Sequence, residues 1–369
     1  MRIGINVSVL KKGENISGIG YYTYRIIKDL IELDEKNEYF LFSNCELSVN
    51  FPLKKNVHFI LLPFKSRLLW SRYILGIKTK KYKLDVFWSP THNLPIVQQR
   101  NTKYFMTVHD IANHILPNIS QSKDNQQRYL RVILNSSCKT ADSIIVPSLA
   151  TKNDLVDYFK VKEDKIKVVY EGGDAEKSIR PIDKKELVDK YKITKPYFLY
   201  IGTLQPRKNI ETIVDAFERL NNSNVQLVLA GGIGWGMEDT LNKIKLSNCS
   251  NNIILTGYIS EAEKAALYSN AMSFVFPSLY EGFGIPILES FSYGIPVITA
   301  RNSSLPEVGG DAAIYMENVH SSEQLEEAMQ TIINMDVQER EALSLKGIKQ
   351  YNKFTWKKCA KGILKCFEN

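Results

Sequence analysis

Short hydrophobic runs typical of strands alternate along the chain with longer helical or loop stretches. Short runs rich in β-branched and aromatic residues, bounded by polar loops, predict buried parallel strands. These runs cover residues 2–7, 38–43, 57–62, 85–90, 104–110 and 143–148 in the first half and 196–203, 225–232, 252–258, 273–278 and 296–300 in the second. Helical or loop stretches separate them, and this alternation predicts two doubly wound α/β domains in tandem.

The two halves open in the same way. Residues 2–33 contain a strand, a loop with glycines and a helix whose apolar residues share one face. Residues 196–220 repeat this order, with Asn209 as a candidate helix N-cap. We therefore expect one Rossmann-like domain at 1–176 and another at 177–353. Ligands of open α/β sheets bind beyond the carboxyl ends of the strands, so two such domains facing each other predict a cleft.

Composition narrows the class of protein without identifying a ligand. The 369 residues are 44% hydrophobic and 24% charged, as in ordinary globular proteins, and the net charge of +8 favours nucleotides, phosphates, membrane surfaces or nucleic acid as partners. Five cysteines without a CxxC pair favour a reduced, cytoplasmic protein. We find no signal-peptide pattern and no apolar run of about 18 residues, so we expect no membrane span.

Two strand-end loops carry patterns that suit phosphate. In "GENISGIGYY", Gly18 and Gly20 lie where a helix starts, and its free N–H groups suit a phosphate, although a plain turn explains the same glycines. In "TLQPRKN", Arg207 and Lys208 precede a helix N-terminus. Cations at a helix N-terminus interact unfavourably with the helix dipole, so their presence is better explained if an anion binds between the cations and the helix. A solvated basic turn is the alternative.

A third loop holds two carboxylates, Glu281 and Glu289, on either side of "GFGIPIL". Pro286 suits the first turn of a helix, so Glu281 is expected in the loop and Glu289 early in the helix. Carboxylates accept hydrogen bonds from hydroxyl groups, and the glycines free backbone N–H groups to face a ligand. The pattern predicts a site for a polyhydroxylated, partly anionic ligand.

The stretch "EGFGIPILE" resembles the E-x7-E signature of retaining glycosyltransferases of family 4, which have the GT-B fold. The resemblance covers nearly the whole chain through the glycines at 18–20, "VHD" at 108–110, "QPRKN" at 205–209, "LAGG" at 229–232, "LTGY" at 255–258 and "SSLPEVGGDAAIYME" at 303–317. The opening and "VHD" are most similar to bacterial O-antigen mannosyltransferases. Many relatives have an asparagine-glycine turn where this chain has "YEGGD" at 170–174, which leaves the hinge between domains open.

The resemblance implies a role for each motif. It places His109, Arg207, Lys208 and Glu281 at the reacting centre. It implies a donor site made by Gly18, Gly20, Gly202, Arg207, Lys208, Gly257, Tyr258, Glu281, Phe283, Gly284, Ile285 and Glu289. Within that site the two cations would hold the diphosphate and Glu289 the ribose. The resemblance also makes residues 1–176 the acceptor domain and residues 177–353 the nucleotide-sugar donor domain, with a C-terminal helix at about 354–369 that packs back on the first.

The implied reaction is transfer of a hexose from a nucleotide diphosphate sugar, as co-substrate, to an acceptor hydroxyl with retention of configuration. GDP-mannose is the first choice of donor, with UDP-linked sugars and dTDP-rhamnose open. The resemblance favours a front-face mechanism over a carboxylate nucleophile. The chain has no D-x-D motif, so we expect no metal and no further cofactor. The acceptor is expected to be a glycan or lipid-linked glycan of bacterial surface polysaccharide.

Residues 63–83 combine seven lysines and arginines with several large apolar residues. A basic amphipathic helix of this kind can lie on an anionic membrane, which would place the protein peripherally on the inner face of the plasma membrane. An ordinary surface helix with its apolar face packed inward explains the same pattern equally well.

Three rival functions remain to be weighed. A dinucleotide-dependent oxidoreductase would need G-x-G-x-x-G after the first strand, and this chain lacks it. A non-catalytic protein that binds nucleotide sugars or glycans would bind donor without turnover. A role with nucleic acid rests on charge alone, without a recognisable binding module, so we expect no such partner.

Overall fold

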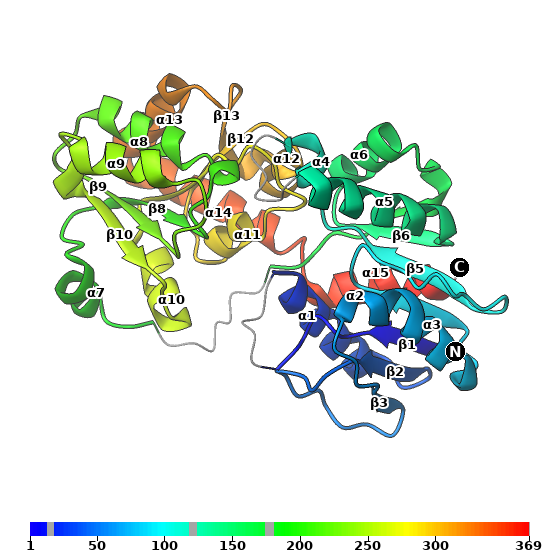
Figure 1. The fold of residues 1–369 in the computed structure, drawn as a ribbon. Coiled ribbons are helices and arrows are strands. Elements are labelled where there is room, and N and C mark those ends of the chain that lie inside the picture. The colour runs from blue at the N-terminus through cyan, green and yellow to red at the C-terminus, as the bar shows by residue number, and fades with distance from the viewer. Residues whose placement is uncertain (13–17, 118–123, 174–180, 369) are drawn as a thin grey trace. The chain divides into compact units, whose positions relative to one another are not determined.

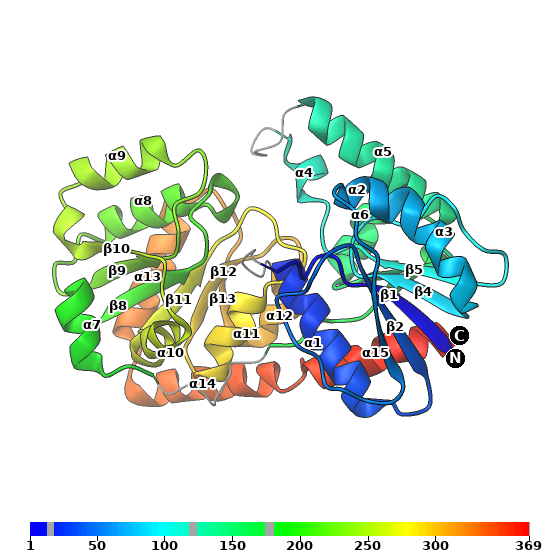
Figure 2. The same ribbon diagram turned by 60° about the horizontal axis from the view of Figure 1, so that its bottom comes forward.

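The computed structural model describes residues 1–12, 18–117, 124–173 and 181–368. The described chain forms two compact units (Figures 1 and 2). Most of residues 1–172, together with the C-terminal helix, make up unit 1, and Gly173–Thr355 make up unit 2. Helix α15 (Trp356–Glu368) packs along α1 (Gly18–Leu33), and the two are drawn side by side in both figures.

Unit 1 is built on a sheet of seven parallel strands. Their order is β3 (Val57–Leu61), β2 (Glu38–Ser43), β1 (Arg2–Asn6), β4 (Val86–Ser89), β5 (Lys103–Thr107), β6 (Ser143–Val146) and β7 (Ile166–Val168). Besides α1 and α15, its helices are α2 (Arg67–Leu69), the π-helical turn η1 (Trp70–Ile74), α3 (Leu75–Thr79), α4 (Ala112–Ile115), α5 (Asp124–Thr140) and α6 (Leu149–Phe159). The strand order reverses direction beside β1, which is the doubly wound pattern.

Unit 2 is built on a sheet of six parallel strands. Their order is β10 (Ile253–Gly257), β9 (Gln226–Ala230), β8 (Tyr197–Ile201), β11 (Ser273–Phe276), β12 (Val297–Ala300) and β13 (Ala313–Met316). Its helices are α7 (Lys184–Tyr191), α8 (Ile210–Leu220), α9 (Glu238–Leu246), α10 (Glu261–Asn270), α11 (Ile285–Ser292), α12 (Leu305–Gly309), α13 (Ser322–Asn334) and α14 (Val337–Tyr351). Figure 2 shows α8 and α13 close together, and these two helices pack against each other.

The prediction of two doubly wound parallel α/β domains is confirmed. Two strands went unrecognised in the sequence, β7 and β13. Strand β7 has only three residues, with the exposed Lys167 in its middle, and β13 is only half-buried over Ala313–Tyr315. Neither segment presents the continuous apolar run that marks a buried parallel strand.

One local prediction needs correction, and a second is confirmed in its position but without the expected side-chain bond. Gly18 and Gly20 belong to the first turn of α1 rather than to a loop before it. The preceding residues 13–17 lie outside the described part of the chain. Asn209 does occupy the N-cap position of α8, but its side chain makes no capping bond there. Its amide instead donates to the carbonyls of Pro277 and Val319 at 3.1 and 2.6 Å.

The basic segment 63–83 folds into the short helices α2, η1 and α3 of unit 1. Trp70 and Leu75 are fully buried, while Leu69, Tyr73 and Ile77 are about half-exposed. One face of the segment therefore packs in the core. The outer face combines large apolar side chains with the exposed lysines and arginines of the segment. None of the helices in the described part of the chain has the length and apolar composition that a bilayer crossing requires.

Candidate functional site

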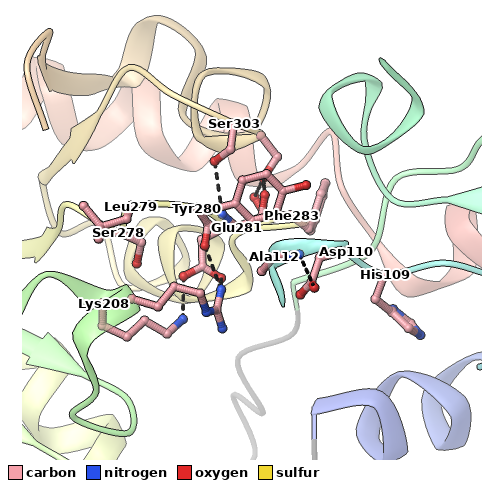
Figure 3. Close-up of polar contacts among 12 residues, drawn as sticks. His109, Asp110, Ala112, Lys208, Ser278, Leu279, Tyr280, Glu281, Phe283 and Ser303 are labelled. Atoms are coloured by element: carbon pink, nitrogen blue, oxygen red, sulfur yellow. Dashed lines mark hydrogen bonds and ion pairs between the residues drawn. The ribbon is translucent and has the colours of Figure 1, made fainter. Parts of the chain in front are cut away.

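The carboxyl ends of the unit 2 strands bring together the two predicted cations and one predicted carboxylate (Figure 3). Lys208 Nζ lies 2.5 Å from Glu281 Oε1, and Arg207 Nη1 lies 3.2 Å from Glu281 Oε2. Arg207 Nη1 also donates to the carbonyl of Tyr280 at 2.7 Å. Arg207 and Lys208 follow β8 and Glu281 follows β11, so the contact joins neighbouring strands of one sheet.

Local backbone structure explains why the two cations project together. Pro206 opens the 3-10 turn η5 (Pro206–Lys208), and Asn209 ends it in the left-handed conformation with φ of 59°. The Leu279 N–H then donates to the Arg207 carbonyl at 2.9 Å, which ties this turn to the loop after β11. The loop that carries the cations is thus held against the loop that carries Glu281.

Glu281 is ionised in this environment. Its side chain is 11% exposed. Burial alone would raise the pKa of Glu281, but the charges of Lys208 and Arg207 lower it below its ordinary value. One carboxylate therefore faces two cations, and the cluster keeps one net positive charge. Such a cluster can accept an anion larger and more highly charged than the carboxylate, such as a diphosphate.

The loop after Glu281 turns directly into helix α11. Gly284 is its N-cap with φ of 117°, a conformation that favours glycine. The N–H groups of Gly284 and Ile285 have no hydrogen-bond partner among the described residues, as expected for the first turn of a helix. Ser304 Oγ lies within hydrogen-bonding distance of the Glu281 and Phe283 carbonyls, at 2.9 and 2.6 Å, and so fixes the loop.

The second carboxylate of the signature has different partners. Glu289 is the fifth residue of α11 and contacts Lys264 Nζ at 3.1 Å and Tyr268 Oη at 3.2 Å. Burial raises the pKa of Tyr268 well above its ordinary value, so its hydroxyl stays protonated and donates to Glu289. Tyr268 stacks on Tyr293 at a centroid distance of 5.4 Å. Helix α10 therefore holds the Glu289 carboxylate in a defined position.

The remaining donor-site predictions in unit 2 fall at the ends of two strands of the same sheet, β8 and β10. Gly202 follows β8, Gly257 ends β10, and Tyr258 follows it with 84% of its surface exposed. Gly231 packs so tightly on Gly202 that a Cβ added to it would lie 2.2 Å from the Gly202 carbonyl oxygen. Backbone fills this edge of the sheet closely and leaves Tyr258 projecting.

The other predicted residues lie in unit 1. Gly18 is exposed and Gly20 is buried in the first turn of α1. His109 follows β5, and its ring is engaged on both sides, by Glu171 at Nδ1 (3.1 Å) and by the Pro90 carbonyl at Nε2 (3.0 Å). Both neighbours are hydrogen-bond acceptors, so the ring accepts a proton from a substrate only after one contact opens and that nitrogen loses its own proton. Its catalytic role stays a prediction.

Sequence reasoning missed the side chains that support the two glutamates. Lys264 and Tyr268 lie one turn apart on α10 and therefore on the same face of the helix. That spacing was the sequence feature from which a shared contact could have been predicted. Ser303 and Ser304 belong to the quoted motif at 303–317 but received no role. Ser303 Oγ accepts from the Glu281 N–H at 3.1 Å.

No group of three or more potential metal ligands occurs among the residues that the structure describes. The charge partners of the Glu281 cluster are side chains, and Lys208 additionally lies over the ring of Phe276 at 5.0 Å.

The sequence of this chain matches the models of two glycosyltransferase families. The profile "Glycosyltransferase Family 4" matches residues 16–177, and "Glycosyl transferases group 1" matches residues 183–350. O-antigen chain mannosyltransferase B of Escherichia coli is 28% identical over 96% of both chains. O-antigen chain mannosyltransferase RfbU of Salmonella typhimurium is 26% identical over 61% of this chain and 58% of its own.

Solved structures share the fold at lower identity. Sucrose-phosphate synthase from Thermosynechococcus elongatus has a TM-score of 0.76 at 18% identity and covers 100% of this chain and 98% of its own. WaaG, a glycosyltransferase of lipopolysaccharide biosynthesis, has a TM-score of 0.72 at 14% identity and covers 99% of both chains. The resemblance inferred from "EGFGIPILE" and its companion motifs is confirmed, and the chain belongs to the family 4 glycosyltransferases of GT-B fold.

Proposed function

We propose that this glycosyltransferase moves mannose from GDP-mannose to a hydroxyl of a glycan or lipid-linked acceptor during synthesis of a bacterial surface polysaccharide. The observation that carries the donor site is the contact of Arg207 and Lys208 with Glu281 at one end of the unit 2 sheet. The similarity to an O-antigen mannosyltransferase along nearly the whole chain supports mannose as the sugar.

In this proposal each group acts where charge develops. As the sugar–phosphate bond breaks, negative charge grows on the leaving diphosphate, and Arg207 and Lys208 stabilise it. The unpartnered N–H groups at Gly284 and Ile285 add backbone donors, and Glu289 binds the ribose hydroxyls. The reaction retains configuration, with the leaving phosphate taking the acceptor proton. Glu281 remains ionised beside the donor sugar and accepts from its hydroxyls.

Other donors would use the same contacts. A UDP-linked sugar carries the same diphosphate and ribose and differs at the base and the hexose. A dTDP-linked sugar carries the same diphosphate but also lacks the 2′-hydroxyl of the ribose. The Anabaena protein HepE, solved with UDP and glucose, shares the fold at 16% identity and a TM-score of 0.72. The alternative to an enzyme is a non-catalytic protein that binds the nucleotide sugar without turnover.

We further propose that unit 1 contacts an anionic membrane through residues 63–83. The outer face of α2, η1 and α3 exposes Leu69, Tyr73 and Ile77 by 51%, 47% and 56%, respectively. The buried Arg72 ties this segment to α5, because its guanidinium donates to Ser136 Oγ at 3.3 Å. Apolar side chains flanked by lysine and arginine suit a surface of anionic lipid headgroups.

Thermal unfolding with GDP, UDP or dTDP tests the donor site directly. A ligand at 100 times its Kd stabilises the folded state by about 2.7 kcal/mol. We expect GDP to raise the melting temperature of wild type but not of Glu289→Ala, with Glu327→Ala, an exposed glutamate in unit 2, as the control. Product analysis with GDP-mannose then reports turnover and anomeric configuration. Stabilisation by UDP or dTDP alone would mean that the donor is a UDP- or dTDP-linked sugar and not GDP-mannose. Binding of the nucleotide sugar without turnover would favour the non-catalytic alternative.

A further inference from the structure

The segment "YEGGD" at 170–174 has no role in the proposed function, yet its glutamate has a defined partner in unit 1. Glu171 lies two positions before Gly173, where the chain passes into unit 2, and its side chain is 7% exposed. Its Oε1 lies 3.1 Å from Nδ1 of His109, which follows β5. A buried carboxylate is costly unless a cation or several donors compensate it, so the state of this histidine matters to Glu171.

The ring of His109 faces a hydrogen-bond acceptor at each nitrogen. Nδ1 faces the carboxylate of Glu171, and Nε2 lies 3.0 Å from the carbonyl oxygen of Pro90. A carboxylate and a carbonyl only accept, and a neutral imidazole carries one proton, so only the doubly protonated ring donates to both. The His109 side chain is 12% exposed, which leaves little room for water to replace either partner.

Most titratable groups around this ring are uncharged. The ring of Tyr22 on α1 meets that of His109 edge-on at a centroid distance of 4.6 Å, and burial raises the pKa of Tyr22 well above its ordinary value. His92 accepts the backbone N–H of His109 at 3.1 Å, and burial lowers the pKa of His92 to about 4. On α15, burial raises the pKa of both thiols, Cys359 and Cys366.

The two nearby carboxylates differ in how they meet the ring. Asp110 is the next residue in the chain, and its Oδ1 accepts the Ala112 N–H at 3.1 Å (Figure 3). Burial alone would lower the pKa of His109, but the hydrogen bond and charge of Glu171 raise it, with smaller contributions from the Pro90 carbonyl and from Asp110. Glu171 is therefore the group that decides the charge of this histidine.

We propose that Glu171 is a positioning residue for His109, which it holds doubly protonated and fixed in orientation, and that the enzyme transfers sugar only in this form. The inference rests on the proposed function, because it concerns turnover of the sugar donor. It makes His109 a fixed cation and not a base. That assignment agrees with a reaction in which the leaving phosphate takes the acceptor proton.

Glu171→Gln separates charge from shape, because glutamine keeps an oxygen that can accept from Nδ1 of His109. Glu171→Asp is the conservative variant that restores a carboxylate. Glu163→Gln removes an exposed carboxylate that pairs with Lys152 and is the matched control. The first measurement is NMR of the full chain, isotope-labelled at its five histidines, across mildly acidic to mildly alkaline pH, with His109→Asn to identify the resonance. The second is the pH profile of kcat and kcat/KM for transfer from GDP-mannose.

We expect the His109 ring of wild type to remain doubly protonated through neutral pH, and transfer to fall as pH rises through the His109 midpoint. Glu171→Gln should move both midpoints to lower pH by about 1 or more, because an adjacent opposite charge has been removed. Glu171→Asp should restore part of that change, and Glu163→Gln should match wild type. A role in packing alone would lower activity without moving the midpoint.

Three results would overturn the proposal: a neutral His109 ring in wild type at neutral pH, an unchanged His109 midpoint in Glu171→Gln, or transfer that rises with pH through that midpoint. The wild-type titration decides the charge of His109 even if Glu171→Gln does not fold. Wild type that gives the expected histidine spectra but no transfer from GDP-mannose would count against the proposed function instead.

Discussion

Nδ1 of His109 lies 3.1 Å from Oε1 of Glu171, and the two side chains are only 12% and 7% exposed. Nε2 of the same ring lies 3.0 Å from the Pro90 carbonyl oxygen. Both neighbours are acceptors, so the ring satisfies both only as an imidazolium. Burial alone would lower the pKa of His109, but the hydrogen bond and charge of Glu171 raise it above its ordinary value. The pair joins the end of β5 to the last residues of unit 1 before Gly173.

We expect Glu171→Gln to destabilise the protein in a pH-dependent way. A raised pKa in the folded state contributes stability that is complete below the unfolded pKa of about 6.5 and is lost as pH rises through the folded value. The loss on breaking this buried pair should therefore be about 3 kcal/mol at low pH and smaller at high pH. Urea unfolding on both sides of neutrality measures it. Glu163→Gln, which removes an exposed partner of Lys152, is the control, and an equal loss at both pH values would contradict the imidazolium.

We expect Glu281→Gln to bind nucleoside diphosphate more tightly while transferring sugar more slowly. The substitution removes the negative charge that Arg207 and Lys208 face, so their attraction for a diphosphate grows. A gain of about 1 kcal/mol corresponds to a Kd roughly fivefold lower. Calorimetric titration at two salt concentrations measures the gain, which should shrink as salt rises. Glu317→Gln, at the exposed pair with Arg301, is the matched control. Weaker nucleotide binding in Glu281→Gln would show that the carboxylate organises the cations rather than competing with the phosphate.

We expect Tyr268→Phe to weaken binding of a nucleoside diphosphate without changing binding of inorganic diphosphate. Tyr268 contacts Glu289, the proposed ribose ligand, whereas Arg207 and Lys208, the proposed diphosphate ligands, contact Glu281. A hydrogen bond to a charged group is worth about 1.5–3 kcal/mol. Without it, the Glu289 carboxylate is held less firmly in the position that binds the ribose. Competition titration with the two ligands separates the effects. Equal losses for both ligands would mean that the variant disturbs the whole sheet edge.

We expect Tyr73→Glu and Ile77→Glu to reduce binding of the protein to vesicles that contain phosphatidylglycerol. Each change places a carboxylate on the exposed face of η1 and α3, where anionic headgroups would repel it. Vesicle co-sedimentation measures binding, with phosphatidylcholine vesicles as the neutral reference. Leu246→Glu, in unit 2 and 86% exposed, should bind like wild type. Unchanged binding of both unit 1 variants would remove residues 63–83 from the membrane proposal.

The sequence alone identified most of this architecture because its signals are local. A buried parallel strand needs a continuous apolar run, and residues such as 197–201 and 273–276 carry one. The same holds for the donor loop, where proline fixes the backbone φ and favours the first turn of a helix, so the helix start near Pro286 could be predicted from the sequence. Strands β7 and β13 escaped because a short or half-buried strand has no such run.

The tertiary structure decided which side chains meet. No local pattern indicates that Glu281 lies against residues more than seventy positions earlier, or that Glu289 lies against Tyr268 of another helix. It also decided that both ring nitrogens of His109 have hydrogen-bond partners, a contact pattern that the motif "VHD" does not indicate. Such pairings depend on strand order and on packing between distant segments. The sequence determined the elements and the residue types at their ends, and folding alone decided the contacts between them.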